Sequence, residues 1–386
     1  MKLAVLGAGM MARAVIFDLV RQGDVDEVLA VDSEPEPLKK LRSAELSPRV
    51  KTARLDVRDR ESLVRLLEPC AVAVSCVPYF LNLELARSAV AAKCHFCDLG
   101  GNNDIVRAEL ALGPGARRAG VAIVPDCGLA PGLVSILAAD GIGRLDSTDT
   151  VRIRVGGLPR RPEPPLNYRI VFSAHGLINE YAEPCVVLRR GRIRILPPLT
   201  EPEPLRFRAP FTRLEAFTTS GGASTLPWTL KGKVKDLDYK TIRYPGHCEQ
   251  VKLLLGLGLG DKRPLQLDNL RIAPRQVLAR LLEQKLGFER DDVILMRVDV
   301  AGSKAGKRRR VRYGCIEYAD KRTGLTAMMR MTGFPAAITA LMLGRGQVAP
   351  GAATGESAIP TRRFIAELCR RGVNLTRRTV ALAGPE

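Results

Sequence analysis

The stretch KLAVLGAGMMA at residues 2–12, followed by a helix-length segment and EVLAVD at residues 27–32, decides the fold of this chain. It is an apolar strand, a Gly-x-Gly-x-x-Ala turn, an amphipathic segment and a second apolar strand ending in an acid. The glycines allow a sharp turn and close approach to a pyrophosphate, and the alanine allows tight helix–strand packing. Free N–H groups at the helix start attract phosphate, and Asp32, 20 residues after Ala12, can bind ribose hydroxyls. The stretch predicts a dinucleotide-binding unit.

Asp32 also predicts which dinucleotide binds. A carboxylate repels the 2′-phosphate of NADP, and the next residue is Ser33 rather than an arginine, so NAD is favoured. Asp56 follows the third expected strand, where it contacts the adenine end of the cofactor or, alternatively, caps the helix from Arg60. The residues expected to contact NAD are Gly7, Ala8, Gly9, Met10, Met11, Asp32, Ser33, Asp56, Val57, Cys76, Val77, Pro78, Leu99 and Gly100.

Length and composition place the chain among soluble two-domain proteins. A chain of 386 residues is long for one core, and 46% hydrophobic with 26% charged residues is ordinary for a globular protein. We find no apolar run of about 18 residues and no signal-peptide pattern, so we expect a cytoplasmic protein without a membrane partner. The nine cysteines, an odd number spread singly, favour reduced thiols over a disulfide framework.

The net charge of +19 raises the possibility of a nucleic-acid partner. Arginines are nevertheless scattered through every segment, and the densest run, residues 304–312, lies between two alternating segments and lacks aromatic residues. This pattern predicts a solvated hairpin tip and no nucleic-acid binding.

Strand and helix patterns alternate from residue 1 to about 125, which predicts a doubly wound parallel sheet, the Rossmann arrangement. The expected strands are 3–6, 27–31, 50–55, 72–75, 95–99 and 121–124, and the expected helices are 10–22, 36–44, 60–67, 81–92 and 104–119.

A Gly- and Pro-rich loop at 126–132 marks the expected domain boundary. Residues 126–335 are predicted to form an α+β substrate-binding and dimerisation domain with a mixed, largely antiparallel sheet. Residues 336–386 are predicted to supply helices that pack back on the Rossmann domain. The expected strands are 151–155, 169–172, 185–188, 192–195, 214–218, 234–244, 292–300 and 311–319, and the expected helices are 133–140, 336–343 and 361–371.

Few residues are candidates for acid–base chemistry in the first domain. His95 lies among apolar neighbours on an expected strand, which favours a structural role. Cys94 and Cys97 have zinc-like spacing, but no second pair follows, so no metal is expected. Asp98 ends the fifth strand before a glycine pair, where its carboxylate either accepts a proton from an amine or stabilises the turn.

The second domain contains the more specific signal. Arg243 lies at the end of an expected strand, before Tyr-Pro-Gly, where a guanidinium can bind a carboxylate through two hydrogen bonds. Polar residues gather between 156 and 181, well before it in the chain.

Several motifs resemble those of the saccharopine dehydrogenase-like oxidoreductases, and within them the lysine 6-dehydrogenases, over nearly the whole chain. They are GAGMM at 7–11, DLGG at 98–101, GLAPG at 128–132, GLP at 157–159, PLNY at 165–168 with FS at 172–173, and RYPGH at 243–247. Relatives that act on a glutamate adduct usually carry Gly-Leu-Asp-Pro-Gly in place of GLAPG and are usually longer. The NEYAEP run at 179–184 is closer to the lysine branch.

The resemblance implies NAD-dependent oxidative deamination of L-lysine at its ε-carbon, with release of ammonia and cyclisation of the semialdehyde product. The ε-ammonium must lose a proton before hydride leaves, and the candidate acceptors are Asp98, His247 and Glu180. Arg243 and an acid such as Glu180 are expected to hold the α-carboxylate and the α-ammonium. The substrate-binding residues that the resemblance implies are Tyr168, Ser173, Asn179, Tyr181, Arg243 and Tyr244. By analogy with other two-domain dehydrogenases, we expect a homodimer or higher homo-oligomer.

Two other functions fit the sequence. A saccharopine- or carboxynorspermidine-type dehydrogenase would act on a secondary-amine adduct and would need a second arginine for a second carboxylate, with Arg169 and Arg213 as candidates. A non-catalytic NAD(H)-binding regulator would also use the first motif, but it would not need the polar residues between Tyr168 and His247. The sequence leaves the lysine and adduct substrates, the general base, dual use of NADP and the subunit count open.

Overall fold

The computed structural model describes residues 1–43 and 47–382, and its internal contacts divide the chain into two units. Unit 1 comprises Met1–Asp140 and Met329–Val373, and unit 2 comprises Gly141–Met328 and Asn374–Glu386. This division differs from the expected limits 1–125, 126–335 and 336–386. Residues 126–140 and 329–335 belong to unit 1, and the last strand belongs to unit 2.

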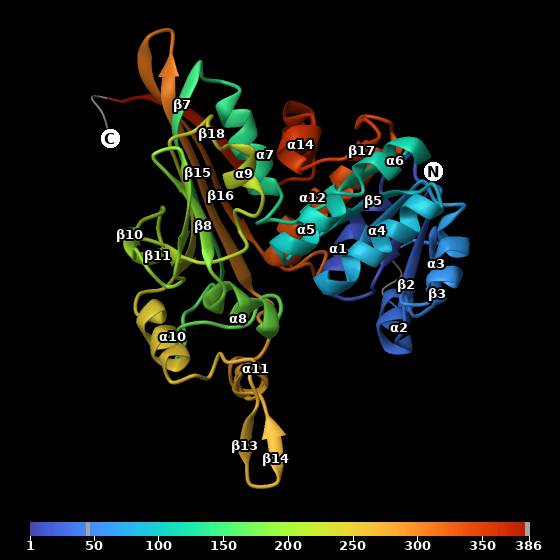
Figure 1. Cartoon of the computed structure of the whole chain (residues 1–386), viewed down its shortest axis with the longest axis horizontal. Helices are drawn as coiled ribbons and strands as arrows, with labels where there is room; N and C mark the ends of the chain where they lie inside the picture. The colour runs from blue at the N-terminus through green and yellow to red at the C-terminus, as the bar shows by residue number, and fades with distance from the viewer. Residues whose placement is uncertain (44–46, 383–386) are drawn as a thin grey trace. The chain divides into compact units, whose positions relative to one another are not determined.

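Unit 1 is built on a seven-stranded parallel sheet with the order β17-β6-β5-β4-β1-β2-β3 (Figure 1). The expected doubly wound sheet is confirmed. Its strands are β1 (Lys2–Leu6), β2 (Glu27–Asp32), β3 (Val50–Arg54), β4 (Val72–Ser75), β5 (His95–Asp98), β6 (Ala122–Val124) and β17 (Gly351–Ala352). Its helices are α1 (Met10–Leu19), α2 (Pro35–Ser43), α3 (Arg60–Leu67), η1 (Tyr79–Leu81), α4 (Asn82–Ala91), α5 (Asn103–Leu110), α6 (Gly113–Ala119), α7 (Leu133–Ile142), α12 (Ala327–Gly344), α13 (Gly355–Ala358) and α14 (Thr361–Arg370), of which α7 and α12 cross the division between the units.

Two details of unit 1 differ from or sharpen the prediction. The helix expected at 104–119 is two helices, because α5 ends at Leu110 and α6 starts afresh with Pro114 in its first turn. The helix expected at 36–44 ends at Ser43, and Ala44 lies outside the described residues. The Nδ1 atom of His95 accepts a hydrogen bond from the N–H of Ala122 at 2.9 Å, so this histidine joins neighbouring strands, as its structural interpretation predicted.

Unit 2 is built on a nine-stranded sheet in which β12 and β7 run parallel and the other pairs run antiparallel, as the prediction of a mixed, largely antiparallel sheet requires. A separate two-stranded hairpin is formed by β13 and β14. The strands are β7 (Ser147–Pro159), β8 (Cys185–Arg189), β9 (Arg192–Leu196), β10 (Glu203–Leu205), β11 (Leu214–Thr218), β12 (Asp236–Arg243), β13 (Leu265–Leu267), β14 (Leu270–Ile272), β15 (Asp292–Lys304), β16 (Lys307–Tyr318) and β18 (Leu375–Ala381). The helices are α8 (Ala174–Ala182), α9 (Leu226–Thr229), α10 (His247–Gly256) and α11 (Pro274–Leu286).

Two expectations for unit 2 were wrong in detail. Residues 169–172 do not form a strand, and only Ile170 makes an isolated bridge, to Phe288. The hairpin tip is confined to Ala305 and Gly306, both with positive φ, and the basic run continues as paired strand β16. Within that strand Arg312 binds Asp299 through two hydrogen bonds of 2.6 and 2.7 Å.

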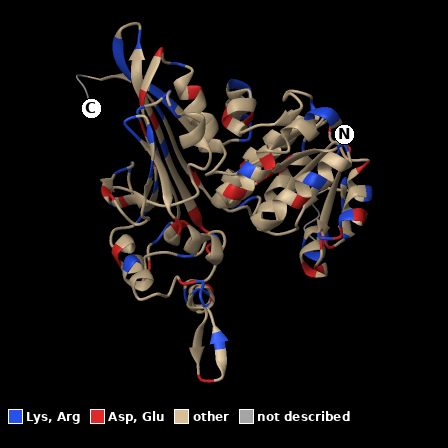
Figure 2. Ribbon diagram, viewed as in Figure 1, with Lys and Arg blue, Asp and Glu red and all other residues tan. Residues whose placement is uncertain are grey.

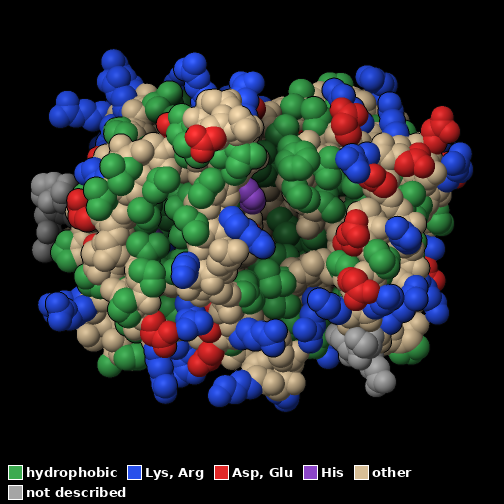
Figure 3. Space-filling view, turned by 90° about the horizontal axis from the view of Figure 1, so that it is seen from below, with side chains coloured by type: hydrophobic (Ala, Val, Ile, Leu, Met, Phe, Trp, Pro, Cys, Tyr) green, Lys and Arg blue, Asp and Glu red, His purple; other side chains and the backbone are tan. Residues whose placement is uncertain are grey.

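Charged side chains are distributed over elements of both units. Lys and Arg are interspersed with Asp and Glu along the ribbon, and the face drawn in Figure 3 shows basic side chains in many separate places (Figure 2, Figure 3). All nine cysteines are free thiols. Within the described ranges, no helix combines the length and apolar character needed to cross a bilayer.

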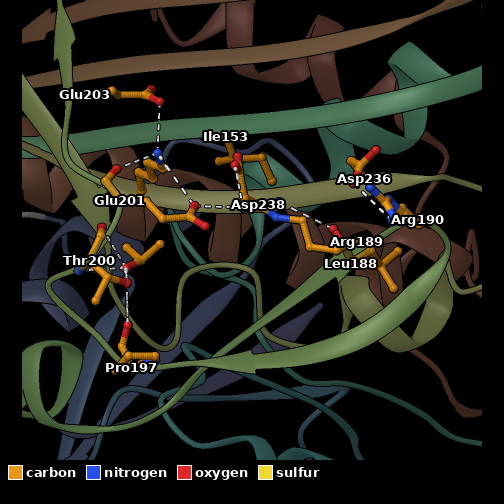
Figure 4. A network of polar contacts seen from close by, with 12 residues as sticks. Ile153, Leu188, Arg189, Arg190, Pro197, Thr200, Glu201, Glu203, Asp236 and Asp238 are labelled. Carbon is orange, nitrogen blue, oxygen red and sulfur yellow. Dashed lines mark hydrogen bonds and ion pairs between the residues drawn. The ribbon is translucent and has the colours of Figure 1, made fainter.

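An ionic network centred on the buried Asp238 and Lys240 covers one face of β12 (Figure 4). Lys240 binds Glu203 at 2.9 Å, and Arg189 contacts Glu201 at 2.8 Å and Asp238 at 3.5 Å. Side chains alternate between the two faces of a strand, so Arg243, an odd number of positions from Asp238 and Lys240, projects from the opposite face. The network therefore accounts for one face of β12 and leaves the other for Arg243.

Candidate functional site

The carboxyl ends of β1 to β4 border a cavity of about 410 Å³ in unit 1. This volume lies within the range of small-ligand pockets, about 300–1,000 Å³. Nine of the residues expected to contact NAD line it: Gly7, Gly9, Asp32, Ser33, Asp56, Val57, Cys76, Val77 and Pro78. Sequence reasoning missed five other residues that line the cavity and lie within a few positions of predicted ones: Val31, Leu55, Arg58, Phe80 and Leu81.

The glycine turn has the geometry that a pyrophosphate requires. Gly7 has a φ of +95°, and a Cβ there would lie 3.1 Å from the carbonyl oxygen of Cys76. A Cβ at Gly9 would meet nothing within 4 Å, so the backbone is open on that side. No side chain caps α1 at Gly9, which leaves the first N–H groups of the helix available for an anion.

The carboxylate of Asp32 is held in place by backbone groups. Its Oδ2 accepts a hydrogen bond from the N–H of Ala8 at 2.8 Å, and its Oδ1 accepts one from Glu34 at 2.9 Å. These contacts join the end of β2 to the glycine turn. The carboxylate therefore lines the cavity in a defined orientation, where it can accept hydrogen bonds from a ribose.

Asp56 lies in the cavity wall and is not a helix cap. Asp59 caps α3 instead, accepting a hydrogen bond from the N–H of Ser62 at 3.2 Å, so the capping alternative for Asp56 was wrong. Arg58 binds Asp56 at 2.6 Å, and these hydrogen bonds lower the pKa of the Asp56 carboxyl to about 2. The pair places a cation and an anion at the rim of the cavity.

Five residues predicted to contact NAD do not line this cavity: Ala8, Met10, Met11, Leu99 and Gly100. Ala8 acts through its backbone on Asp32, and the N–H of Gly100 donates to Asp98 at 2.6 Å.

Asp98 is completely buried in unit 1. Its Oδ1 also accepts a hydrogen bond from the N–H of Asp126 at 3.3 Å, which matches its interpretation as a turn-stabilising acid. Burial raises the pKa of Asp98, and it raises that of Glu109, a second fully buried carboxyl group that interacts with it. Asp98 has no exposed surface, and its catalytic role remains a prediction.

Unit 2 brings together five residues that the sequence singled out, from one loop, two helices and the end of one strand. They are Tyr168 from the loop after β7, Glu180 and Tyr181 from α8, Arg243 from the end of β12, and His247 from the start of α10. The guanidinium carbon of Arg243 lies 4.7 Å from the ring centre of Tyr168 and 5.7 Å from that of Tyr181. The ring centres of Tyr168 and His247 are 5.3 Å apart.

Hydrogen bonds link the members of this cluster in a chain from Arg243 through Tyr181 and His247 to the carbonyl of Leu166. The carbonyl of Leu166 can only accept, so His247 donates from Nδ1 at 2.9 Å; with its pKa lowered to about 3, the ring is neutral and its Nε2 accepts from the hydroxyl of Tyr181 at 3.0 Å. The Tyr181 oxygen in turn accepts from Nε of Arg243 at 2.8 Å. His247 is therefore a neutral imidazole with both nitrogens engaged.

Electrostatics support the same protonation state. Burial, together with the charge of Arg243, lowers the pKa of His247 to about 3. His247 is thus a poor proton acceptor near neutral pH. Its observed contacts position Tyr181 and, through Tyr181, the guanidinium of Arg243.

Arg243 and Glu180 form the charged part of the cluster. Arg243 is buried, and its Nη1 donates to the carbonyl of Ile242 at 2.9 Å. Its Nη2 lies 3.8 Å from Oε2 of Glu180, which is a loose contact, and the Glu180 side chain remains 27% exposed. Desolvation raises the pKa of Glu180 to about 7, although Arg243 opposes the shift. A cation and a titrating carboxyl group thus lie side by side.

The other predicted substrate residues have structural contacts. Ser173 is the N-cap of α8, accepting from the N–H of Gly176 at 3.3 Å, and Tyr244 donates to the carbonyl of Pro159 at 2.9 Å. Asn179 binds a second buried arginine, Arg275 of α11, which sequence reasoning missed because α11 lies about 100 residues further along the chain. Substrate binding by these residues remains a prediction.

Comparison with protein families accounts for most of the chain. Residues 3–124 match the family described as "Saccharopine dehydrogenase NADP binding domain", and residues 128–373 match "Saccharopine dehydrogenase C-terminal domain". The two matches meet within the Gly- and Pro-rich loop after β6.

Curated relatives are similar over part of their length. The NADP(+), L-glutamate-forming saccharopine dehydrogenase of Saccharomyces cerevisiae is 24% identical over 305 residues, which is 74% of this chain and 64% of that protein. The mitochondrial alpha-aminoadipic semialdehyde synthase of Bos taurus is 26% identical over 200 residues, which is 50% of this chain and 21% of that protein. The chain thus spans less than two thirds of these relatives.

Solved structures show the same fold. The apo saccharopine dehydrogenase (L-Glu forming) of Saccharomyces cerevisiae superposes with a TM-score of 0.80 at 20% identity, covering 98% of this chain and 100% of that one. The homospermidine synthase of Legionella pneumophila, determined in complex with NAD, gives a TM-score of 0.67 at 12% identity, covering 99% and 91%. With both domains matched in sequence, the chain belongs to the saccharopine dehydrogenase family.

Proposed function

We propose that this protein is an NAD-dependent oxidoreductase that oxidises L-lysine at its ε-carbon. The observation that carries the proposal is the pair of Arg243 and Glu180, a buried cation beside a half-buried carboxyl group whose pKa is about 7. This pair is complementary to the carboxylate and ammonium that an amino acid carries on one carbon atom. The glycine turn and Asp32 support a dinucleotide, and NAD in particular, as the cofactor.

In this proposal Arg243 binds the α-carboxylate of lysine through its Nη atoms, because its Nε is already bonded to Tyr181. Glu180, in its ionised form, binds the α-ammonium. Tyr168, packed against the Arg243 guanidinium, forms an aromatic wall for the apolar side chain of lysine. The ε-carbon is then the reacting end of the substrate.

The bound nicotinamide would supply the hydride acceptor for the ε-carbon. Hydride loss from the neutral amine leaves an imine, water adds to it, ammonia departs, and the aldehyde cyclises with the α-amino group. Asp98 remains the sequence prediction for the acceptor of the ε-ammonium proton. His247 is better suited to positioning, since both of its nitrogens are engaged.

The first experiment follows the absorbance of NADH with purified protein, NAD and L-lysine, without a keto acid. Formation of NADH with lysine, and not with ornithine or with NADP in place of NAD, is the expected result. A protein that binds NAD but forms no NADH with any amine would contradict the proposal and favour the regulatory alternative.

A second candidate is a dehydrogenase that acts on a secondary-amine adduct carrying two amino-acid ends. Arg275 favours it, because a second buried guanidinium lies beside Asn179, one residue from Glu180. Arg169, one of the two arginines proposed for this role, instead pairs with Glu163 at 2.6 Å. Oxidation of saccharopine, with no oxidation of free lysine, would establish this candidate in place of the first.

Glu180 is expected to make lysine binding depend on pH. Its raised pKa of about 7 means that the carboxyl is neutral below this pH and ionised above it, so binding of the α-ammonium weakens as pH falls through 7. We expect kcat/KM for lysine to show this ionisation. Glu180→Gln should remove it and raise KM about tenfold, the value of one charge-assisted hydrogen bond.

The matched control for Glu180 is Glu183→Gln, which changes a nearby acid that contacts Lys262 at 3.6 Å. An unchanged pH profile in Glu180→Gln would show that another group titrates, and the assignment of the α-ammonium to Glu180 would then be wrong.

His247→Phe tests the positioning role of the imidazole. The ring shape is largely kept, but the carbonyl of Leu166 loses its donor and the Tyr181 hydroxyl loses its acceptor. Because the second loss releases the residue that orients Arg243, we expect KM for lysine to rise about tenfold, the value of one buried hydrogen bond. The pH profile between 5 and 8 should keep its shape, because a histidine with a pKa near 3 does not titrate there. Loss of an ionisation in that range would instead identify His247 as a titrating catalytic group.

A further inference from the structure

A second cavity, of about 260 Å³, lies in unit 1 between α12 and α14, helices that are both visible in Figure 1. It is separate from the dinucleotide cavity and shares none of its residues. One wall is apolar and comes from Ile338, Leu341 and Met342 of α12. The cavity is several times larger than the volume that one water molecule occupies, about 30 Å³.

Four arginines line the cavity, and one of them, Arg345, already binds both carboxylate oxygens of Asp24 at 2.8 Å. The other three lie in α14 or directly after it: Arg363, Arg370 and Arg371. Arg345 directly follows α12. Positions 363, 367, 370 and 371 fall on one face of a helix because they are spaced by about one and two turns. The side chains range from exposed, at 70% for Arg370, to almost completely buried, at 7% for Arg371.

The acids near these arginines do not pair with every guanidinium N–H group. Glu367 lies in the cavity wall and binds Arg370 at 2.9 Å and Arg371 at 2.7 Å, while Asp18 binds Nε of Arg371 at 2.8 Å. Among the described residues, Nη2 of Arg371 and Oδ2 of Asp18, on the two sides of this ion pair, are both buried and have no hydrogen-bond partner. A buried donor without an acceptor costs about 1–3 kcal/mol, so this nitrogen requires an explanation.

Helix dipoles explain only part of the arrangement. Arg370 and Arg371 lie at the carboxyl end of α14, where cations are favourable. Arg363 lies in the first turn of the same helix, where the dipole disfavours a cation and favours an anion. An anion in the cavity would offset the unfavourable charge of Arg363 and would offer an acceptor to Arg371.

We propose that this cavity binds a small organic phosphate, with its phosphate group on the arginines and its organic part against the apolar wall. Phosphate is the anion that best matches several guanidinium groups, because it accepts paired hydrogen bonds in more than one direction. Arg363 and Arg370 are exposed and capture the phosphate at the entrance, and Arg371 lies deeper. The apolar residues of α12 contact the remainder of the ligand.

The test is calorimetric titration of the full-length protein with phenyl phosphate and, separately, with inorganic phosphate at constant ionic strength. We expect one saturable site, with phenyl phosphate binding more tightly than inorganic phosphate. Arg363→Ala should weaken binding of phenyl phosphate about tenfold, through loss of one charge-assisted contact. Arg362→Ala is the matched control, since it removes a neighbouring exposed arginine from the same first turn that does not line the cavity.

Equal affinity in Arg363→Ala and Arg362→Ala would place the anion elsewhere, for instance on the glycine turn, and would overturn the proposal. Absence of saturable binding in the unaltered protein would overturn it as well. Equal affinity for the two probes would overturn the organic part of the assignment. Because Arg363 is exposed, its variant is expected to fold, which thermal unfolding followed by circular dichroism verifies.

Discussion

Replacement of Arg243 by Met raises KM for L-lysine by at least about thirtyfold, because truncating one partner of a buried charge pair costs about 2–5 kcal/mol. The guanidinium is almost completely buried and already oriented by Tyr181 and the carbonyl of Ile242. A substrate carboxylate placed there without the cation would be desolvated and unpaired. Steady-state kinetics with lysine as the varied substrate measure this effect.

Binding of NAD serves as the internal control for Arg243→Met. The dinucleotide cavity is built entirely from residues of unit 1, whereas Arg243 belongs to unit 2. The dissociation constant of NAD, measured by calorimetry, should therefore stay within about twofold of the original value, as expected for sites without shared contacts. Arg213→Ala, which removes an exposed arginine, is the matched variant and should leave KM unchanged.

Unchanged KM in Arg243→Met would show that the substrate carboxylate binds elsewhere. Arg243→Lys adds a graded comparison, because lysine keeps the positive charge but lacks the fork that binds a carboxylate at two points. We expect its KM to lie between those of the original protein and Arg243→Met.

Asp32→Ala is expected to weaken NAD binding by about ten- to a hundredfold, since two hydrogen bonds to the ribose are lost. The substitution should also reduce the preference for NAD over NADP, because the repulsion of a 2′-phosphate disappears. In addition, the N–H of Ala8 loses its acceptor, which loosens the glycine turn. Dissociation constants for both dinucleotides measure the two effects separately.

Asp32→Asn separates charge from hydrogen bonding. It keeps an acceptor for Ala8 but removes the negative charge, so NADP binding should improve more than NAD binding weakens. Glu34→Ala is the control, because Glu34 is an exposed acid close to Asp32 that does not line the cavity. An unaltered ratio of the NAD and NADP dissociation constants in Asp32→Asn would contradict the proposed selectivity.

The local part of the fold and of the cofactor site was predictable from the sequence. The strand limits of β4 and the helix limits of α3 agree with the expected residues, because each is a short apolar or amphipathic run with clear ends. The glycine turn and Asp32 were predictable because strand, turn and helix are adjacent in the chain, so their spacing carries the geometry.

Errors arose where structure depended on partners distant in the chain. Residues 169–172 have the composition of a strand, but only Ile170 pairs, with a residue more than 100 positions away. For Asp98, the sequence left a catalytic and a turn-stabilising role open, and the contacts of the second role come from Gly100 in the next turn and from Asp126, 28 residues away. Composition specifies neither the pairing partner nor the orientation of a side chain after a turn.

The sequence by itself determined the dinucleotide-binding turn, the two types of sheet and the family, because these depend on local spacing and on the periodicity of apolar residues. Only the tertiary structure brought the residues of the polar cluster together and set their electrostatic environment. Burial lowers the pKa of His247 to about 3, and desolvation raises the pKa of Glu180 to about 7. Both effects depend on how much water the surrounding elements exclude, and that is a property of packing rather than of residue order.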